Sequence, residues 1–284
     1  MGIYKNNILL KIGGISFLLS FMSYLIIKPT IFETSRNSFA FPLSLFILIA
    51  IIIAPIIEEA TFRGIFTKNR TLRIISMLST IIILIASFNF WPVYFLLFVY
   101  LFLFFLKKEL TLCILNASFF AVIHFKIDDF KKIDFLPQLL FYISIGLILI
   151  WFVKNFGLIK GIILHSLWNF LLIIIMLFSL QFPDQNLYSV TNKDFIFKFK
   201  KEKLLKNNIS KINYQENKIT VDNIEPINLY KTLTLKHNLQ LENFKQKEPY
   251  VKYSFTLESK HKISQKEIDL KILAFLKNEK ILIR

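Results

Sequence analysis

The sequence predicts an all-α polytopic membrane bundle of about seven transmembrane helices, followed by a small α+β soluble domain. The chain of 284 residues is 55% hydrophobic, with a mean hydropathy of +0.54, which is too apolar for an ordinary soluble domain. Long uncharged runs fill the part before Pro183, whereas charged residues dominate after it. We therefore expect a transmembrane domain over residues 1–183 and a soluble domain over residues 184–284.

Seven apolar runs approach the roughly 20 residues that a membrane-spanning helix needs. They are residues 8–27, 40–66, 74–89, 91–106, 110–125, 136–153 and 157–182. The first run contains Lys11, lacks a small-x-small cleavage pattern and is followed by Lys28, so we expect an uncleaved span. The third and fourth runs are joined by Asn89-Phe90-Trp91-Pro92, which predicts the tight turn of a helical hairpin.

The distribution of Lys and Arg between the loops predicts the orientation of these spans. One side carries Lys5, Lys11, Arg63, Lys68, Arg70, Arg73, Lys107, Lys108, Lys154 and Lys160. The other side carries Lys28, Arg36, Lys126, Lys131 and Lys132. Ten basic residues against five place the amino terminus in the cytoplasm, and with seven spans the tail is then extracytoplasmic. The expected location is the cell (inner) membrane.

The tail after Pro183 has the pattern of a small folded domain. Alternating apolar and polar residues over 194–200, 218–222 and 250–257 predict half-buried strands. Residues 228–237 and 264–276 predict helices, the second capped by Ser264 with Glu267 three residues on. His237 and His261 lie in polar stretches, where we expect them at the surface.

The tail carries 20 Lys and Arg against 12 Asp and Glu, a surplus that suits contact with anionic lipid headgroups. No motif supports nucleic-acid binding, and no catalytic constellation is evident in the tail. We expect a regulatory or binding module whose partner the sequence does not identify. The single Cys113 lies in an apolar run, which excludes a disulfide framework and a Cys-type metal site and predicts a core position.

The residues Glu58-Glu59-Ala60-Thr61-Phe62-Arg63 come directly after an uncharged apolar run. Charges at such a depth cost about 2.5 to 3.5 kcal/mol each unless they are paired or hydrated. Glu59 and Arg63 are four residues apart on a helix and can pair, whereas Glu58 points about 100° away. An unpaired carboxylate in this setting suits a general base or a metal ligand.

Two histidines also occur within apolar helices, His124 at the end of Phe120-Ala121-Val122-Ile123-His124 and His165 in His165-Ser166-Leu167-Trp168-Asn169. Ionisable groups in membrane spans usually face the bundle interior and mark function. Glu58, His124 and His165 form a ligand set for a hydrolytic divalent metal such as Zn²⁺. The same residues also work without metal, with Glu58 activating water and His and Asn donors stabilising an oxyanion. Both alternatives predict attack of water on a carbonyl inside the membrane.

These three motifs together resemble the CAAX-protease and bacteriocin-processing family of intramembrane proteases, also called the abortive-infection family. Its marks are Glu-Glu-x-x-x-Arg, Phe-x-x-x-His and His-x-x-x-Asn on successive helices, and the resemblance covers about residues 40–182. It implies that Glu58 is the water-activating base, Glu59 a second acidic residue and Arg63 its structural partner. It further implies that His124 and His165 are ligands or proton carriers and that Asn169 is an oxyanion donor or ligand.

Two features depart from the family pattern, namely a longer gap before His124, by about the hairpin 74–106, and the added basic tail. We expect an intramembrane endopeptidase that acts on a peptide or protein substrate reached within the lipid membrane. One alternative is a non-catalytic immunity or scaffold protein of the same fold that binds partners through its tail. Another is an ion or proton carrier that uses the buried Glu and His residues.

Overall fold

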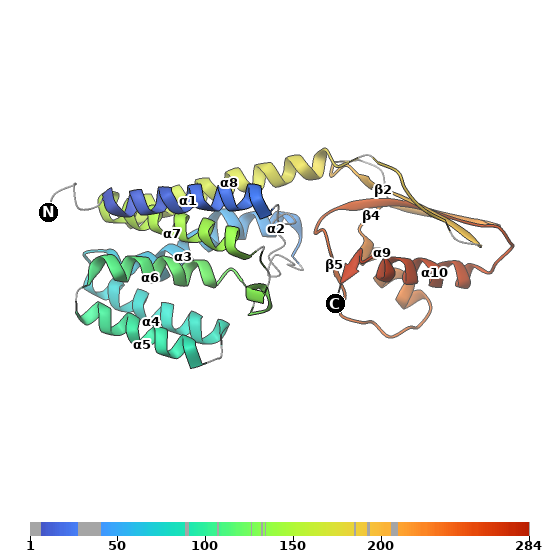
Figure 1. Ribbon diagram of the computed structural model, residues 1–284. Coiled ribbons are helices and arrows are strands. Elements are labelled where there is room, and N and C mark those ends of the chain that lie inside the picture. The colour runs from blue at the N-terminus through green and yellow to red at the C-terminus, as the bar shows by residue number, and fades with distance from the viewer. Residues whose placement is uncertain are drawn as a thin grey trace. The chain divides into compact units, whose positions relative to one another are not determined.

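The computed structural model (Figure 1) places most of the chain in defined elements. It describes residues 7–27, 41–88, 91–106, 108–125, 127–131, 133, 135–184, 186–191, 194–205 and 210–283. Contacts divide the chain into two compact units, Met1–Asn37 with Ser44–Leu171, and Ser38–Leu43 with Leu172–Arg284. The first unit is helical, and the second contains an antiparallel sheet. Each unit is described by itself below.

Eight elements make up the helical part of the chain. They are α1 (Asn7–Ile27), a continuous helix Leu43–Phe66, α4 (Arg70–Ser87), α5 (Trp91–Phe105), α6 (Glu109–Val122), the 3₁₀ turn η5 (Ile127–Lys131), α7 (Phe135–Phe156) and α8 (Leu158–Gln181). Within the described residues, five helices are long and apolar enough to cross a membrane: Asn7–Ile27, Leu43–Phe66, Arg70–Ser87, Phe135–Phe156 and Leu158–Gln181. The predicted spans 91–106 and 110–125 correspond to the shorter helices α5 and α6, so the count of about seven is not confirmed.

Local capping explains where the observed helix ends differ from the predicted ones. Helix α4 begins at Arg70 rather than at residue 74, because Asn69 caps it by accepting a hydrogen bond from the Leu72 amide. Gly157 separates α7 from α8 with a φ of +90°, a conformation that glycine adopts without strain. Several residues used in the predictions lie outside the described part of the chain: Asn89 and Phe90 of the predicted turn, and Lys5, Lys28, Arg36, Lys107, Lys126 and Lys132 of the loops.

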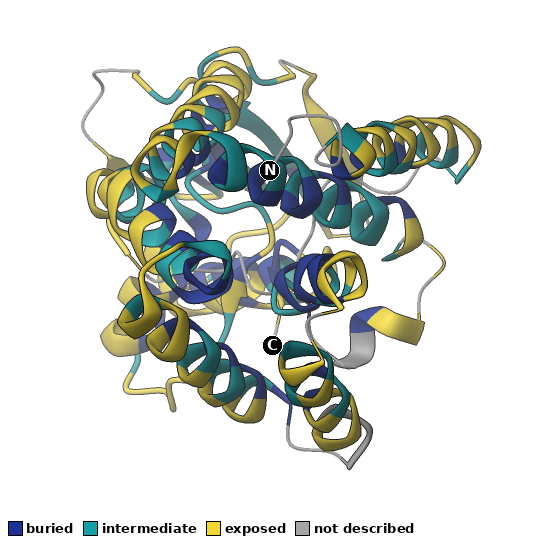
Figure 2. Cartoon of the chain, turned by 90° about the vertical axis from the view of Figure 1, so that its left-hand side faces the viewer, coloured by how far each residue is buried: buried dark blue, intermediate teal, exposed yellow. Residues whose placement is uncertain are grey.

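Small residues allow α1 and α7 to approach closely along their lengths. A Cβ atom added at Gly13 would lie 3.1 Å from Ile148 Cγ1, so only glycine leaves the present spacing undisturbed. The Ser144 hydroxyl donates to the Gly13 carbonyl at 2.8 Å, and Ser20 donates to the Pro137 carbonyl at 2.7 Å. Figure 2 shows the buried residues on the helix faces that meet inside this unit and the exposed ones on the outward faces.

Two apolar clusters fill the interior of the helical unit. The first joins helix Leu43–Phe66 to α4, α5 and α6 and consists of Phe62, Ile65, Leu84, Phe88, Leu97, Tyr100, Leu112, Phe119 and Phe120. The second joins α1, α6 and α7 through Leu9, Cys113, Ala117, Leu147 and Ile150. Cys113 is fully buried there, which confirms its predicted core position.

The carboxyl-terminal sheet has the strand order β1-β2-β6-β4-β3, with every neighbouring pair antiparallel. Its strands are β1 (Tyr188–Thr191), β2 (Phe195–Glu202), β3 (Lys211–Gln215), β4 (Lys218–Ile224) and β6 (Lys252–Ser259), and β5 (Lys245–Gln246) pairs separately with β7 (Leu282–Ile283). The two helices are α9 (Pro226–Lys236) and α10 (Gln265–Asn278). The predicted strands and helices are therefore confirmed, as is the Ser264 cap, whose hydroxyl accepts from the Glu267 amide.

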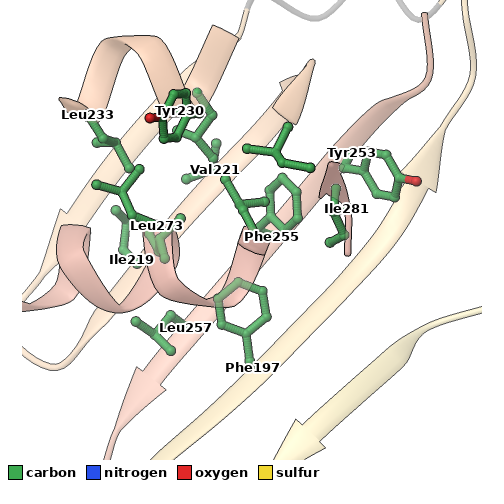
Figure 3. Packing of buried hydrophobic residues seen from close by; sticks show 14 of the residues in the cluster. Phe197, Ile219, Val221, Tyr230, Leu233, Tyr253, Phe255, Leu257, Leu273 and Ile281 are labelled. Carbon is green, nitrogen blue, oxygen red and sulfur yellow. The ribbon is translucent and has the colours of Figure 1, made fainter. Parts of the chain in front are cut away.

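Alternating side chains of the sheet pack against α9 and α10 to form the core of this unit (Figure 3). Phe197, Val221 and Phe255 are buried from the strands, and Leu233 and Leu273 are buried from the two helices. The last turns of α8 belong to the same unit, with Leu180 in the cluster and Met176 packed against it.

A polar cluster in this unit corrects the prediction that His237 lies at the surface. The fully buried carboxylate of Asp269 accepts hydrogen bonds from Lys236 Nζ at 2.7 Å, His237 Nε2 at 2.8 Å and the Tyr214 hydroxyl at 2.9 Å. The His237 side chain is only 10% exposed, because it partners a carboxylate on the neighbouring helix α10. His261 is exposed as predicted.

Candidate active site

The predicted carboxylate pair lies in a helix whose hydrogen-bond period changes along its length. Helix Leu43–Phe66 runs as α-helix over Leu43–Leu48, as π-helix over Ile49–Ile53, as α-helix over Ala54–Glu58, as π-helix over Glu59–Arg63 and as 3₁₀-helix over Gly64–Phe66. Pro55 has no N–H, and its ring would clash with the carbonyl four residues earlier in a regular α-helix. The wider π-turn just before it relieves that clash. The Glu pair lies at the junction between the short α-helical segment Ala54–Glu58 and the second π-segment, which begins at Glu59. Such π-turns are common at functional sites.

Hydroxyl groups from α4 form hydrogen bonds with the backbone of the second π-segment and of the turn that follows it. The Thr61 carbonyl receives hydrogen bonds from Ser76 Oγ at 2.5 Å and Thr80 Oγ1 at 2.9 Å. Ser76 Oγ also accepts from the Ile65 amide at 2.8 Å. A Cβ atom at Gly64 would lie 2.9 Å from Ser76 Cβ, so glycine is needed for this close approach. These contacts fix the helix immediately after Glu58 and Glu59.

Glu59 and Arg63 form the ion pair expected from their four-residue spacing. Arg63 Nη1 lies 3.4 Å from Glu59 Oε1, and both side chains are fully buried. The guanidinium carbon of Arg63 lies 3.9 Å from the centre of the Phe120 ring, a cation–π contact. The three guanidinium nitrogens and Glu59 Oε2 have no hydrogen-bond partner among the described residues. The pair is thus held by its opposite charges and by ring contacts, and these four polar atoms remain able to form further hydrogen bonds.

His165 of α8 connects the two carboxylates. Its Nδ1 donates to Glu59 Oε1 at 2.8 Å, and its Nε2 lies 3.7 Å from Glu58 Oε2. The second distance is too long for a direct hydrogen bond, although one water molecule can bond to both atoms at that separation. The His165 side chain is 6% exposed and that of Glu58 is 24% exposed. Residues 106 positions apart in sequence are therefore gathered in one buried cluster.

Asn169 lies one turn further along α8 and contacts the first π-segment. Its Nδ2 donates to the Ala50 carbonyl at 2.8 Å. A side-chain amide has two N–H groups on that nitrogen, so this bond uses one of them. The bond also links α8 to helix Leu43–Phe66 beyond the carboxylate pair.

His124 lies in a turn just past the end of α6, because that helix ends at Val122 and not at the predicted residue 125. Its Nδ1 donates to the Phe120 carbonyl at 2.7 Å, and its ring stacks on Tyr142 of α7 with centroids 4.2 Å apart. The Phe120 ring lies next to both imidazoles, with 4.8 Å between its centroid and that of the His124 ring and 6.1 Å between its centroid and that of the His165 ring. Phe120 thus lies between the two predicted site histidines.

Glu58, His124 and His165 are the predicted metal donors. Among the described residues no group of three or more His, Cys, Asp or Glu side chains is arranged to hold a metal ion. The Nδ1 atoms of both histidines bond to protein oxygens, which leaves Nε2 of each ring as the nitrogen available to a metal. Divalent-metal binding therefore stays a prediction.

Sequence reasoning assigned no role to Tyr142, Ser76 or Thr80, all of which support the cluster. Each is a polar side chain within an apolar helix, which is the sequence feature that could have indicated a contact inside the bundle. Ser76 and Thr80 are four residues apart, so their hydroxyls share the face of α4 that meets Thr61. The roles of these residues depend on partners in other helices, which no spacing rule identifies.

The fold and the cluster define a helical membrane protein with carboxylate and imidazole groups gathered inside it. Residues 40–171 match the family model described as type II CAAX prenyl endopeptidase Rce1-like. This segment therefore belongs to the CAAX-protease and bacteriocin-processing family, which confirms the resemblance seen in the motifs. Membership indicates a protease of the CAAX type that acts within a membrane. No curated protein and no solved structure matched the chain.

Proposed function

We propose that the chain is an intramembrane endopeptidase that hydrolyses a peptide bond with water activated by Glu58. The observation that carries this proposal is that Glu59, which is ion-paired with Arg63, accepts a hydrogen bond from His165 Nδ1, so that His165 Nε2 lies toward Glu58. Because Nδ1 donates to Glu59, Nε2 is the nitrogen available for proton transfer. A carboxylate orienting an imidazole in this way is a recurrent arrangement in hydrolases.

The proposed reaction begins with a water molecule between Glu58 Oε2 and His165 Nε2. Glu58 takes one proton from the water, and the resulting hydroxide bonds to the carbonyl carbon of the substrate peptide. Donors beside the site stabilise the oxyanion, and Asn169 is the predicted one, through the N–H that Ala50 does not use. The C–N bond then breaks, and the proton held by Glu58 passes to the amine that leaves, with His165 as the proton carrier.

The roles of the remaining predicted residues follow from their contacts. Arg63 is a positioning residue, because its charge holds the Glu59 carboxylate that in turn orients His165. The His124 ring contacts the Phe120 ring, which in turn contacts the His165 ring. In the proposal His124 is a donor or proton carrier next to the reacting groups. A bound Zn²⁺ would supply Lewis-acid polarisation of the carbonyl, and metal analysis of purified protein tests that alternative.

The experiment that tests the proposal compares Glu58→Gln with Glu109→Gln in full-length protein reconstituted into liposomes. Glu109 is an exposed residue of α6 that pairs with Lys154 outside the cluster. Removing a general base lowers the rate by about 10² to 10⁴-fold. We expect that loss for Glu58→Gln and near-native cleavage for Glu109→Gln, measured with prenylated and unprenylated versions of one membrane-anchored reporter peptide.

Folding of both variants is checked by their thermal unfolding in detergent. A folded Glu58→Gln protein that cleaves at the native rate would contradict the proposal. If that variant also keeps its full function in cells, the non-catalytic scaffold alternative gains support instead. Proton flux into the same liposomes would favour the carrier alternative, whereas the protease proposal predicts none.

A further inference from the structure

The carboxyl-terminal unit contains the ends of two membrane-spanning helices, and these ends mark the membrane surface within it. Leu172–Gln181, the last part of α8, belongs to this unit, as does the segment leading into helix Leu43–Phe66. The Tyr250 hydroxyl donates to the Phe41 carbonyl at 3.1 Å, two residues before that helix begins. Parts of the sheet unit are therefore bonded to chain segments at the ends of two candidate membrane spans.

The loop after β2 is bonded directly to the last turn of α8. The Leu204 amide donates to the Leu180 carbonyl at 3.0 Å, and the Leu205 amide donates to Gln181 Oε1 at 3.0 Å. Both acceptors lie in the final residues of a candidate membrane span. The loop 203–205 consequently lies beside the point where α8 leaves the bilayer.

Apolar side chains at this point are exposed rather than packed. Leu205 is 73% exposed and Phe182 is 63% exposed, and the Phe182 ring contacts that of Phe178 one turn earlier, itself exposed. A single exposed leucine on a soluble domain needs no explanation. Leu205 differs because its backbone is bonded to the end of a candidate membrane span whose own apolar residues are exposed. The apolar surface of α8 therefore continues onto the loop.

The depth of the contact supports the same conclusion. Helix α8 has 24 residues and is about 36 Å long, whereas the hydrocarbon core is about 30 Å thick, so about one turn in all, divided between its two ends, extends beyond the core. Met176 packs against the core of the sheet unit, and it precedes Gln181 by about 7.5 Å along the helix axis. If α8 crosses a bilayer, the part of the sheet unit that packs on Met176 would therefore lie at the level of the interfacial layer.

We propose that loop 203–205 and Phe182 form a membrane-contact edge, with Leu205 inserted at the boundary between headgroups and acyl chains. Lys203 is exposed beside Leu205 and lies in a tail with 20 basic and 12 acidic residues. A lysine next to an inserted apolar side chain binds anionic headgroups. The occupant is lipid rather than protein, because the edge is continuous with the lipid-facing surface of α8. The proposal does not depend on the chain being a protease.

The test uses full-length protein with Leu205→Cys carrying a polarity-sensitive fluorophore, in liposomes of phosphatidylcholine with or without phosphatidylglycerol. Cys113 is fully buried and is not a competing label site. The matched control is Leu235→Cys on α9, which is 62% exposed and has no bond to α8 in the described structure. We expect blue-shifted emission and quenching by shallow spin-labelled lipid for residue 205, and neither effect for residue 235.

A second variant tests the contribution of charge. Lys203→Glu in the Leu205→Cys background should lower the ratio of inserted to non-inserted label by about fivefold or more in anionic liposomes. Each lysine near such a surface contributes about 1 kcal/mol to binding. The same change should have little effect in phosphatidylcholine alone. Equal, weak quenching at residues 205 and 235 would overturn the proposal. A blue shift that depends on protein density and resists lipid quenching would also overturn it, by showing that a second copy or another protein covers the edge.

Discussion

Two fully buried carboxylates, one in each unit, are satisfied in different ways. Asp269 in the sheet unit accepts hydrogen bonds from Lys236, His237 and Tyr214, with both of its oxygens used. Glu59 in the helical unit directs one oxygen to His165 and Arg63, while Oε2 has no hydrogen-bond partner among the described residues.

The comparison distinguishes the Asp269 cluster, which is structural, from the Glu59 cluster, which has polar atoms free to bind water or substrate. A buried polar group without a partner costs about 1 to 3 kcal/mol, so proteins retain few of them. The cluster around Asp269 is saturated and holds β3, α9 and α10 together. The cluster around Glu59 keeps unused donors and acceptors beside Glu58, which suits a site that must accommodate water and substrate.

The largest expected difference follows from replacing one histidine in each cluster. His165→Asn should lower peptide cleavage by about 10² to 10⁴-fold, because it removes the proton carrier facing Glu58. His237→Asn removes a carboxylate partner of the same type and should leave cleavage near the native rate. Reporter cleavage by both full-length variants in liposomes measures the contrast. Similar losses in the two variants would contradict the distinction between the clusters.

The reverse contrast is expected for stability. Asp269→Ala leaves three donors without their acceptor, and we expect local unfolding of α9 and α10 to become easier by about 1 to 3 kcal/mol. Hydrogen exchange of these helices in the intact protein measures the change. Glu216→Ala is the control, because its ion pair with Lys262 is exposed and contributes little. Unchanged protection in Asp269→Ala would show that the saturated cluster is not what holds these helices.

The smallest expected effect is a pH dependence of the sheet unit. Burial lowers the pKa of Lys236, but hydrogen bonds to Asp269 and Tyr214 outweigh it, so the pKa is raised overall. A lysine with a raised folded-state pKa adds stability that is complete below the unfolded value of about 10.4 and is lost as pH rises through the folded value. The difference in hydrogen exchange between the native protein and Lys236→Gln should therefore be constant from about pH 7 to 9 and shrink above about pH 10.4. A difference that shrinks already near neutral pH would contradict this assignment.

The sequence predicted the features that depend on composition and local spacing. Apolar runs identified the long helices, alternation identified β2, β4 and β6, and four-residue spacing identified the Glu59–Arg63 pair. The predicted number of spans is not confirmed, because α5 and α6 are shorter than the five helices that are long enough to cross a bilayer.

Contacts between distant segments were beyond the reach of local rules. Motif order placed Glu59 and His165 in one site, but only packing shows that His165 Nδ1 bonds to Glu59 and leaves Nε2 toward Glu58. His237 was expected at the surface because its neighbours in sequence are polar, whereas its partner lies 32 residues away. The catalytic roles of the site residues and the boundary at residue 183 stay predictions.

The π-segment Ile49–Ile53 holds one residue more than an α-helical stretch of about the same rotation needs. Deleting one residue there would let α-helical bonding resume with Glu58 and Glu59 still directed toward α8. Deleting one residue from the α-helical part Leu43–Leu48 would instead turn everything beyond it by about 100° relative to the preceding turns. The first π-segment is therefore the place in this helix where a change of chain length disturbs the carboxylates least.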